Sequence, residues 1–445
     1  MYENCKIFIL GMARSGYESA KLLSNYHNEI IVCDAKEQDS EHVKELEKLG
    51  VKVIITDKPE ELLDNSFKVV VKNPGIKYTN PLVVKAKELM IPVVNEVEMS
   101  YHFMPDCQII GVTGSNGKTT TTTLIYEFLK QAKKPVIMAG NMGIPVASAL
   151  KDLTKDSILL LEISIQQLCN MQEFKTNVSV LTNLTPTHID FMDTYENYMQ
   201  TKKRIFNNHT KNDLAIINLE NEDEVKLTED IKSTKVYFSS VNDASICLKN
   251  ETIVYNDEEI IKLKDIKLQG SHNYENIMCA IVASKRYGVS NADIYQVLST
   301  FGGVEHRLEY VTDINGVNFY NDSKATNTVS TMIALKAFKS PLILILGGLD
   351  RGHSFDPLDD YLTHVKLIVC YGQTKDRIKE WGNKQGKEVV VVDNLIKATD
   401  YAYSKAINGD TILLSPACAS WDQYKCFEDR GIEFKKEVNK IKESK

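Results

Sequence analysis

The sequence predicts an α/β protein of three domains, and three observations support this prediction. Strand-like apolar runs alternate with helical patterns along nearly all of the 445 residues, which is typical of parallel sheets with helices on both faces. At roughly 150 residues per domain, this length corresponds to about three domains. Hydrophobic residues make up 43% and charged residues 25%, which argues against a disordered, collagen-like or coiled-coil chain.

The first domain is expected over residues 1–97 and should be Rossmann-like. Apolar runs that fit strands alternate there with amphipathic patterns that fit helices. We expect strands at 6–10, 30–34, 51–55, 69–72 and 92–94, and helices at 15–26, 40–49 and 81–90.

The central domain is expected over residues 98–303, with the layout of a P-loop ATPase. A strand, a Gly-rich loop and a helix from Lys118 open it, and Gly302-Gly303 at its end is a candidate hinge. Short alternating segments between 235 and 268 predict a small antiparallel sheet beside the parallel one. We expect strands at 108–112, 135–139, 158–162, 178–182 and 214–218, and helices at 195–208, 273–287 and 291–300.

The third domain, expected over residues 304–445, should again be Rossmann-like. It opens with a hairpin, continues with long apolar strands and ends in a polar helix. We expect strands at 309–314, 317–321, 342–346, 366–371, 388–392 and 411–415, and helices at 327–338 and 422–443.

Charge and cysteine content restrict the function classes. The formal net charge of −7 disfavours a broad nucleic-acid or membrane footprint. No apolar stretch approaches the roughly 20 residues that a membrane helix needs, and the opening MYENCKIFIL lacks a basic signal-peptide region. Nine cysteines without a CxxC pair or ligand cluster are typical of buried free thiols in a reducing compartment. We therefore expect a cytoplasmic protein.

The strongest local motif is the Gly-rich loop between a strand and a helix in IIGVTGSNGKTTTT (109–122). Its backbone N–H groups and the positive end of the following helix suit phosphate oxygens, and Lys118 can reach the β- and γ-phosphates. Thr119 supplies a hydroxyl for Mg²⁺. Val112 stands where the usual GxxxxGK[ST] pattern has glycine, so the loop is a variant. The motif predicts ATP or GTP binding.

A weaker motif lies near the start of the chain. Gly11 and Gly16 follow the first strand and Asp34 ends the next, which is the layout of a dinucleotide fingerprint. Ala13 occupies the middle glycine position and should hinder a pyrophosphate, so NAD and another nucleotide-bearing ligand both remain open. The segment KNPG (72–75) follows a later strand and should lie beside this site.

Metal and catalytic candidates follow further strands of the central domain. Glu162 ends the run SILLLE, at the place where a second Mg²⁺ ligand is usually found. His188 follows the next strand and could bind metal or a charged substrate, although a lone His is more often structural. Lys202, Lys203 and Arg204, taken alone, are typical of a solvated helix face.

Three polar loops follow strands of the third domain, at 320–327, 347–352 and 414–431. Because open α/β sheets bind ligands at the carboxyl ends of their strands, these loops should share one pocket. Cys418 is a possible nucleophile, but no His lies near it in the sequence and a structural role is favoured.

Taken together, these motifs resemble the Mur ligase family, the ATP-dependent amide ligases that build the stem peptide of peptidoglycan. The motif TGSNGKTT is shared with folylpolyglutamate synthases. The motifs NDSKATN and LSPACAS are far more specific to the D-glutamate-adding members of the family. The segments that carry the resemblance are TGSNGKTT (113–120), the Glu162 segment, HID (188–190), YMQTKKRIF (198–206), GSHNYEN (270–276), EHRLE (305–309), NDSKATN (321–327) and LSPACAS (414–420).

The resemblance implies roles in binding ATP and two Mg²⁺ ions. Thr119, Glu162 and His188 would bind metal, and Lys202 resembles the lysine that becomes carbamylated by CO₂ and then also binds metal. Lys118, Glu162, His188 and Lys202 would be the catalytic set. The residues expected to contact ATP are Gly114, Ser115, Asn116, Gly117, Lys118, Thr119, Thr120, Asn273, Asn276, Arg307 and Asp322.

It also implies two substrate sites. One would bind the UDP part and phosphates of a nucleotide-sugar, through Arg14, Ser15, Asp34, Asn73, Pro74, Gly75 and Asn141, with His188 near the reacting group. The other would bind D-glutamate, through Lys324, Thr326, Arg351, Ser420 and Phe427. Asn73 and Arg351 stand where relatives have Ser and Lys, and Arg and Lys differ in hydrogen-bond geometry.

The implied activity is the ATP-dependent addition of D-glutamate to UDP-N-acetylmuramoyl-L-alanine. It would pass through an acyl phosphate and a tetrahedral intermediate and release ADP and phosphate, with the chain acting as a monomer on these small molecules. A ligase for another amino acid, a folylpolyglutamate synthase, an NAD-linked dehydrogenase and a nucleotide-dependent switch remain alternatives. The dehydrogenase would leave the phosphate loop unexplained.

Overall fold

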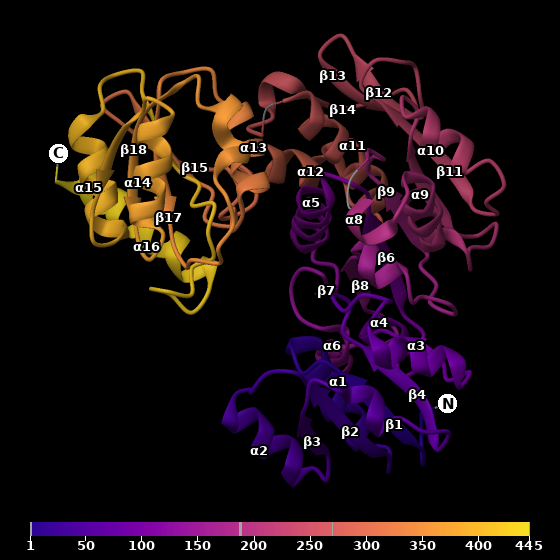
Figure 1. Cartoon of the computed structure of the whole chain (residues 1–445). Coiled ribbons are helices and arrows are strands. Elements are labelled where there is room, and N and C mark those ends of the chain that lie inside the picture. Colours follow the sequence, from indigo (N-terminus) through magenta and orange to yellow (C-terminus); the bar gives the residue numbers. More distant parts are fainter. Residues whose placement is uncertain (1, 187–188, 269, 445) are drawn as a thin grey trace. The chain divides into compact units, whose positions relative to one another are not determined.

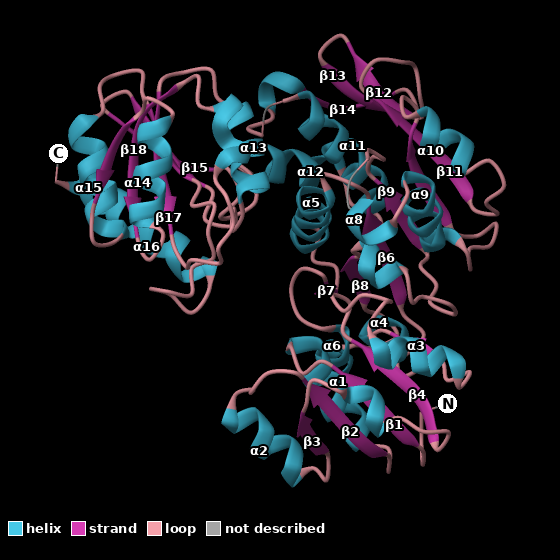
Figure 2. Ribbon diagram, viewed as in Figure 1, coloured by secondary structure: helices cyan, strands magenta, loops and turns pink. Residues whose placement is uncertain are grey.

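Three β-sheets organise the part of the chain that the structure, a computed structural model, describes, namely residues 2–186, 189–268 and 270–444. Helices and strands alternate along the chain, as the mixed α/β prediction requires (Figure 2). The chain divides into two compact units, Met1–Phe301 and Gly302–Lys445 (Figure 1). The first unit contains two of the sheets and the second contains the other.

The first sheet is entirely parallel and has the strand order β3-β2-β1-β4-β5. Alternate residues of β1 face opposite sides, so Ile7 and Ile9 join one apolar cluster and Phe8 and Leu10 the other. The chain order reverses between β1 and β4, which is the switch point where such sheets bind ligands. The elements are β1(Lys6–Leu10), α1(Arg14–Ser24), β2(Glu29–Asp34), α2(Ser40–Lys48), β3(Lys52–Ile55), β4(Phe67–Lys72), α3(Pro81–Glu88), β5(Val93–Val94) and α4(Glu96–Tyr101).

The central sheet has nine strands in the order β14-β13-β12-β11-β10-β9-β6-β8-β7. Its strands are β6(Gln108–Thr113), β7(Val136–Gly140), β8(Ile158–Glu162), β9(Val178–Leu181), β10(Leu214–Asn218), β11(Thr234–Ser239), β12(Ile246–Lys249), β13(Thr252–Tyr255) and β14(Glu258–Lys262). Its helices are α5(Lys118–Gln131), α6(Val146–Ala149), α7(Ile165–Leu168), α8(Ile189–Met192), α9(Tyr195–Lys203), α10(Glu222–Leu227), α11(Ser271–Lys285) and α12(Asn291–Leu298).

The antiparallel part of this sheet is smaller than the sequence predicted. β11 pairs parallel with β10, and β12 pairs parallel with β11, so only β12, β13 and β14 form antiparallel pairs. The helix α10 returns the chain to the starting edge before β11, which makes that strand parallel. An alternation of polar and apolar residues does not distinguish the two directions.

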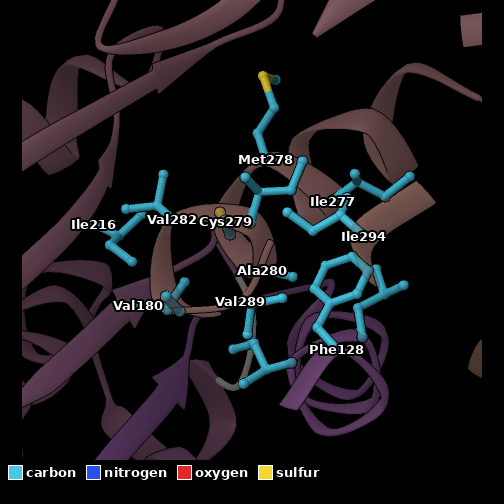
Figure 3. Packing of buried hydrophobic residues seen from close by; sticks show 14 of the residues in the cluster. Phe128, Val180, Ile216, Ile277, Met278, Cys279, Ala280, Val282, Val289 and Ile294 are labelled. Atoms are coloured by element: carbon cyan, nitrogen blue, oxygen red, sulfur yellow. The ribbon is translucent and has the colours of Figure 1, made fainter. Parts of the chain in front are cut away.

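A large apolar core supports the helix that follows the phosphate loop. α11 packs against α5, and residues 276–284 of α11 are buried on all sides. Figure 3 shows Phe128 of α5 near Ile277 and Ile294, and Val180 and Ile216 of the sheet near Val282. Such close packing fixes the start of α5 relative to the sheet.

The second unit is built on a sheet with the order β15-β16-β20-β17-β18-β19. The hairpin of β15 and β16 is antiparallel, and the other pairs are parallel. The helices at 375–384 and 395–405 were not singled out in the sequence. The elements are β15(Glu309–Ile314), β16(Val317–Asn321), α13(Thr328–Lys336), β17(Leu342–Gly347), β18(Val365–Tyr371), α14(Lys375–Lys384), β19(Glu388–Val391), α15(Leu395–Lys405), β20(Thr411–Leu414) and α16(Phe427–Glu443).

The last helix begins at Phe427, five residues later than position 422, where it was predicted to start. The Ser420 carbonyl accepts hydrogen bonds from the backbone N–H groups of Gln423 and Tyr424, so the preceding segment forms a turn. All nine cysteines are free, and Cys5, Cys169 and Cys426 are partly exposed rather than buried. Among the described residues, no helix combines the length and apolar character that a membrane span requires.

Candidate nucleotide and substrate sites

The phosphate loop needs glycine at two positions. Gly114 and Gly117 have φ values of +143° and +81°, which side chains rarely adopt. A Cβ at Gly114 would lie 2.0 Å from Thr182 Oγ1, and one at Gly117 would lie 2.1 Å from Asn276 Oδ1. Val112, by contrast, is a buried residue of β6, so the loop starts after it and needs no glycine there.

A segment after β9 holds the loop in place, and the sequence analysis missed it. The backbone N–H of Ser115 donates to the Asn183 carbonyl (2.8 Å), and the N–H of Asn116 donates to Asn183 Oδ1 (2.9 Å). Thr182 Oγ1 donates to the Asn116 carbonyl (2.5 Å). The signal was the polar Thr-Asn pair directly after an apolar strand that neighbours β6. These contacts tie the loop to the segment that follows β9.

Two lysines converge on one carbonyl of this loop. Lys118 Nζ donates to the Gly114 carbonyl at 2.9 Å, and Lys202 Nζ donates to the same oxygen at 3.0 Å. Lys118 Nζ also reaches the Ser115 carbonyl, and Lys202 Nζ the hydroxyl of Thr113. Two lysine amino groups therefore meet at the N-terminus of α5, where helix geometry favours anions.

Lys202 contradicts the interpretation of its helix face as solvated. Its side chain is only 1% exposed, whereas Lys203 forms a surface ion pair with Asp230 and Arg204 donates to the Cys169 carbonyl. Burial, and then the charge of Lys118, lowers the pKa of Lys202 well below its usual range, while Glu162 acts in the opposite direction. Burial of this kind is typical of a functional lysine.

Glu162 ends β8 beside β6, and its two oxygens differ. Oε1 accepts a hydrogen bond of 2.6 Å from Asn141 Nδ2, whereas Oε2 is buried and has no hydrogen-bond partner among the described residues. Within these residues, no group of three or more His, Cys, Asp and Glu side chains could hold a metal. Mg²⁺ needs only one or two carboxylates when phosphates supply other ligands, so an unpaired buried carboxylate oxygen fits this ion.

The other central residues lie around the same loop. Thr119 and Thr120 are in the first turn of α5, and Thr119 is buried. Asn276, at the second turn of α11, accepts a hydrogen bond from Thr121 Oγ1 (3.3 Å), and Asn273 lies one turn before it. His188 lies outside the described residues, so its position stays a prediction.

The first sheet brings its predicted residues together at the switch point. Asp34 Oδ2 accepts from the Met12 N–H (2.8 Å), and Asn73 Nδ2 donates to Ser15 Oγ (3.2 Å). Arg14 Nη1 donates to the Gly143 carbonyl (3.2 Å), two residues after Asn141. The segments that follow β1, β2 and β4 thus form one edge, with Pro74 and Gly75 in the last of them.

In the second unit, a buried carboxylate marks the loop after β16. Asp322 accepts from Ser415 Oγ (2.7 Å) and from the Leu308 N–H (3.2 Å). Burial raises the pKa of Asp322 to about 7, while Arg307 and Arg430 favour its charged form. Arg307 itself is exposed.

The residues expected to bind an amino-acid substrate lie on or directly after three loops of that unit, and Arg430 connects these loops by hydrogen bonds. This fully buried side chain donates to Ser323, to the Gly347 carbonyl and to the Cys418 carbonyl. Sequence reasoning missed it, because an Arg in a polar helix carries no sign of burial. Lys324 Nζ lies 5.7 Å from the Phe427 ring, and Arg351 stacks 4.6 Å from the Trp421 ring, whereas Ser420 is buried and Thr326 half-buried.

Cys418 is buried, and its Sγ lies 3.9 Å from His353 Nε2, a neighbour that the sequence did not indicate. Burial raises the pKa of this thiol to about 11. A nucleophilic cysteine needs a lowered pKa, so the structural role fits this environment better.

The fold and the loop geometry define an α/β protein with three sheets and a Gly-rich loop between a strand and a helix. Family models match the chain in three segments: the Mur ligase family catalytic domain at residues 33–106, the Mur ligase middle domain at 112–284 and the Mur ligase glutamate ligase domain at 306–418. The chain therefore belongs to the Mur ligase family, and it is an enzyme, as predicted.

Three full-length relatives have the same name. Proteins of Geobacillus sp. (strain WCH70) and Geobacillus kaustophilus (strain HTA426) are 47% and 44% identical, with 99% of each chain covered in both comparisons, and both are named UDP-N-acetylmuramoylalanine–D-glutamate ligase. A Bacillus cereus (strain G9842) protein of the same name is 42% identical, with 99% of this chain and 98% of that protein covered.

Solved structures share the fold at low sequence identity. The UDP-N-acetylmuramate-alanine ligase MurC of Thermotoga maritima has a TM-score of 0.59 at 19% identity, with 99% of this chain and 100% of that chain covered. MurF of Acinetobacter baumannii has a TM-score of 0.57 at 14% identity, with 93% of this chain and 86% of that chain covered.

Proposed function

We propose that this enzyme joins D-glutamate to UDP-N-acetylmuramoyl-L-alanine with ATP, in the synthesis of peptidoglycan precursors. The observation that carries the ligase chemistry is the convergence of Lys118 and Lys202 on the Gly114 carbonyl, at the start of α5. The name shared by the full-length relatives supports the choice of substrates.

The reaction must first activate a carboxylate, because a carboxylate does not react with an amine at neutral pH. Transfer of the γ-phosphoryl group of ATP to a carboxylate oxygen forms an acyl phosphate and ADP. The D-glutamate amine then attacks the acyl carbon, and the tetrahedral intermediate expels phosphate. Negative charge rests on oxygen atoms throughout, so the Lys118 ammonium and the N–H groups at the start of α5 stabilise it.

Mg²⁺ fits the residues around the loop. Thr119, Glu162, His188 and a carbamylated Lys202 would hold two ions, which when bound would neutralise phosphate charge. An ammonium cannot bind a cation, but burial lowers the pKa of Lys202 and so favours the neutral amine, which is the form that adds CO₂ to give a carbamate. Glu162 Oε2 is suited to a metal, since it is buried and unpaired among the described residues and ends the strand beside β6.

Each domain would bind one substrate. We assign the nucleotide-sugar to residues 1–97, ATP to residues 98–303 and D-glutamate to residues 304–445. Arg14, Ser15 and Asn73 would contact the UDP part, and Lys324 and Arg351 would bind carboxylates of D-glutamate. We further expect a cytoplasmic monomer that binds neither nucleic acid nor membrane.

Phosphate release tests this function. The purified chain is incubated with ATP, Mg²⁺ and UDP-N-acetylmuramoyl-L-alanine, and D-glutamate is compared with L-glutamate, L-lysine and meso-diaminopimelate. We expect turnover with D-glutamate alone. Turnover without an amino acid would indicate a nucleotide switch, and preference for another amino acid would indicate a sibling ligase.

A further inference from the structure

Lys72, the last residue of β4, is a buried amine that the reaction above does not use. Its side chain is 1% exposed, and no carboxylate forms an ion pair with it in the described part of the chain. Val70 and Lys72 are two residues apart on the strand and so face the same side, on which Val70 packs with Phe8 and Leu10. An ammonium in such an apolar layer needs several hydrogen-bond acceptors.

All the acceptors of Lys72 belong to the loop that follows it. Its Nζ donates to the carbonyls of Asn73 (3.2 Å), Pro74 (3.3 Å) and Ile76 (2.7 Å). A lysine has three N–H donors, so one loop takes its full donor capacity. Three carbonyls turned toward one nitrogen fix the peptide planes of the loop.

This loop lies at the switch point of the first sheet. Asn73 Nδ2 donates to Ser15 Oγ, and a Cβ at Gly11 would lie 2.9 Å from the Asn73 Cβ. On its other side, Tyr78 OH donates to Asn170 Oδ1 (2.8 Å), and Asn170 Nδ2 donates to the Val93 carbonyl (3.0 Å). The loop therefore connects the β1 loop with the central domain.

The fold alone does not require this charge. Replacing a buried ion with an apolar side chain of similar volume is often neutral or stabilising. Burial also lowers the pKa of Lys72 to about 8, which shows that the ammonium is disfavoured at this position. An apolar residue at position 72 could fill the same space but could not form the three hydrogen bonds to the loop.

We propose that Lys72 is a positioning residue for the nucleotide part of the substrate. Its ammonium holds residues 73–76 in the conformation that binds a nucleoside diphosphate beside Ser15. This inference rests on the proposed function, which assigns the nucleotide-sugar to the first domain.

The test compares Lys72→Met with Lys68→Met in the full chain. Lys68 is on the same strand but exposed, so it controls for the loss of a lysine. Calorimetry measures the Kd of UDP and of ATP, and steady-state kinetics give KM for each substrate. For Lys72→Met we expect UDP binding and KM for the nucleotide-sugar to weaken by about tenfold or more, equivalent to about 1.4 kcal/mol, with kcat and the ATP Kd within about twofold. Lys68→Met should match the unmodified enzyme.

Other results overturn the proposal in distinct ways. Unchanged UDP binding and KM in Lys72→Met would remove the role of Lys72 and leave the proposed function intact. Loss of ATP binding in parallel, or failure of the variant to fold, would show that Lys72 serves the fold as a whole. If the unmodified chain itself did not bind UDP, the assignment of the first domain would be wrong.

Discussion

Lys118 and Lys202 donate hydrogen bonds to the same atom, the carbonyl oxygen of Gly114, although 84 residues separate the two lysines in the sequence. The hydroxyl groups of Ser115 and Tyr198, from the same two segments, lie 2.7 Å apart. The helix α9 therefore places Lys202 and Tyr198 in contact with the phosphate loop. In the proposed reaction, negative charge develops on phosphate oxygens beside both lysines, and each lysine contributes a different chemical property. Lys118 supplies a charge, and Lys202 supplies an amine whose pKa is lowered by burial.

Removal of the Lys202 amine should abolish activity. We expect Lys202→Ala to be inactive and partly rescued by short-chain carboxylates, because a small carboxylate can occupy the place of the carbamate. Lys203→Ala is the matched control, since Lys203 is the next residue of α9 and pairs with Asp230 at the surface. Undiminished activity of Lys202→Ala would refute the role of this residue.

The variant Glu162→Gln tests whether activity depends on the negative charge of this side chain or only on its hydrogen bond with Asn141. The Gln side-chain oxygen can still accept from Asn141 Nδ2, so we expect the fold to be kept, but the charge available to Mg²⁺ is lost. Activity should fall by at least about 100-fold, and Mg²⁺ titration should show a weaker dependence. Asp156→Asn, in the exposed turn before β8, should have no effect. Equal activity of both variants would exclude Glu162 as a metal ligand.

Gly117→Ala and Gly50→Ala form a matched pair, because both glycines have φ of +81°. A Cβ at Gly117 would lie 2.1 Å from Asn276 Oδ1, whereas nothing lies within 4 Å of one at Gly50. Each variant should lose about 1–2 kcal/mol of unfolding free energy from backbone strain. Only Gly117→Ala should also lose ATP binding, measured by calorimetry, and normal ATP affinity in that variant would contradict the loop geometry.

Ser420→Ala should affect substrate binding but not stability. The buried hydroxyl of Ser420 has no hydrogen-bond partner among the described residues, so its removal should change the unfolding free energy by less than about 1 kcal/mol. KM for D-glutamate should rise, because in the unmodified enzyme this hydroxyl is free to form a hydrogen bond with a ligand, and the variant loses that hydrogen bond. Ser415→Ala, which removes a donor to Asp322, should instead destabilise by about 1–3 kcal/mol. An unchanged KM in Ser420→Ala would remove Ser420 from the D-glutamate site.

We expect the unfolding free energy to depend on pH because of Glu96. This buried residue of α4 accepts from the Ala147 N–H (2.5 Å), and burial raises its pKa from 4.5 to about 7, with Glu18 acting in the same direction. Because the folded-state pKa is the higher one, the stabilisation is fully present below about pH 4.5 and is lost as the pH rises through about 7.

Urea unfolding between pH 5 and pH 8 checks this dependence. The Gln side chain of Glu96→Gln cannot ionise. As the pH rises, the unfolding free energy of this variant should therefore increase relative to that of the unmodified enzyme. Glu88→Gln, at the exposed end of α3, should keep the pH dependence of the unmodified enzyme. Parallel curves for Glu96→Gln and the unmodified enzyme would show that Glu96 does not titrate in this range.

Local patterns predicted most of the secondary structure. Apolar strands followed by polar loops indicated which residues would lie at the sheet edges, and this placed Glu162 and the phosphate loop on adjacent strands. The direction of β11 was not predictable from alternation, because it depends on the return of the chain through α10. Nor could the sequence indicate the burial of Lys202 and Arg430, since both are surrounded by polar neighbours in the sequence and only tertiary packing covers them.

The central claim is that ATP activates the carboxylate that then joins D-glutamate, and an oxygen-transfer measurement tests it most directly. UDP-N-acetylmuramoyl-L-alanine labelled with ¹⁸O in its carboxylate is incubated with ATP, Mg²⁺ and D-glutamate, and the phosphate is analysed by mass spectrometry. Transfer through an acyl phosphate predicts one ¹⁸O atom in each phosphate released. Released phosphate without ¹⁸O would mean that its fourth oxygen came from water, so that ATP is hydrolysed directly, and would contradict the account.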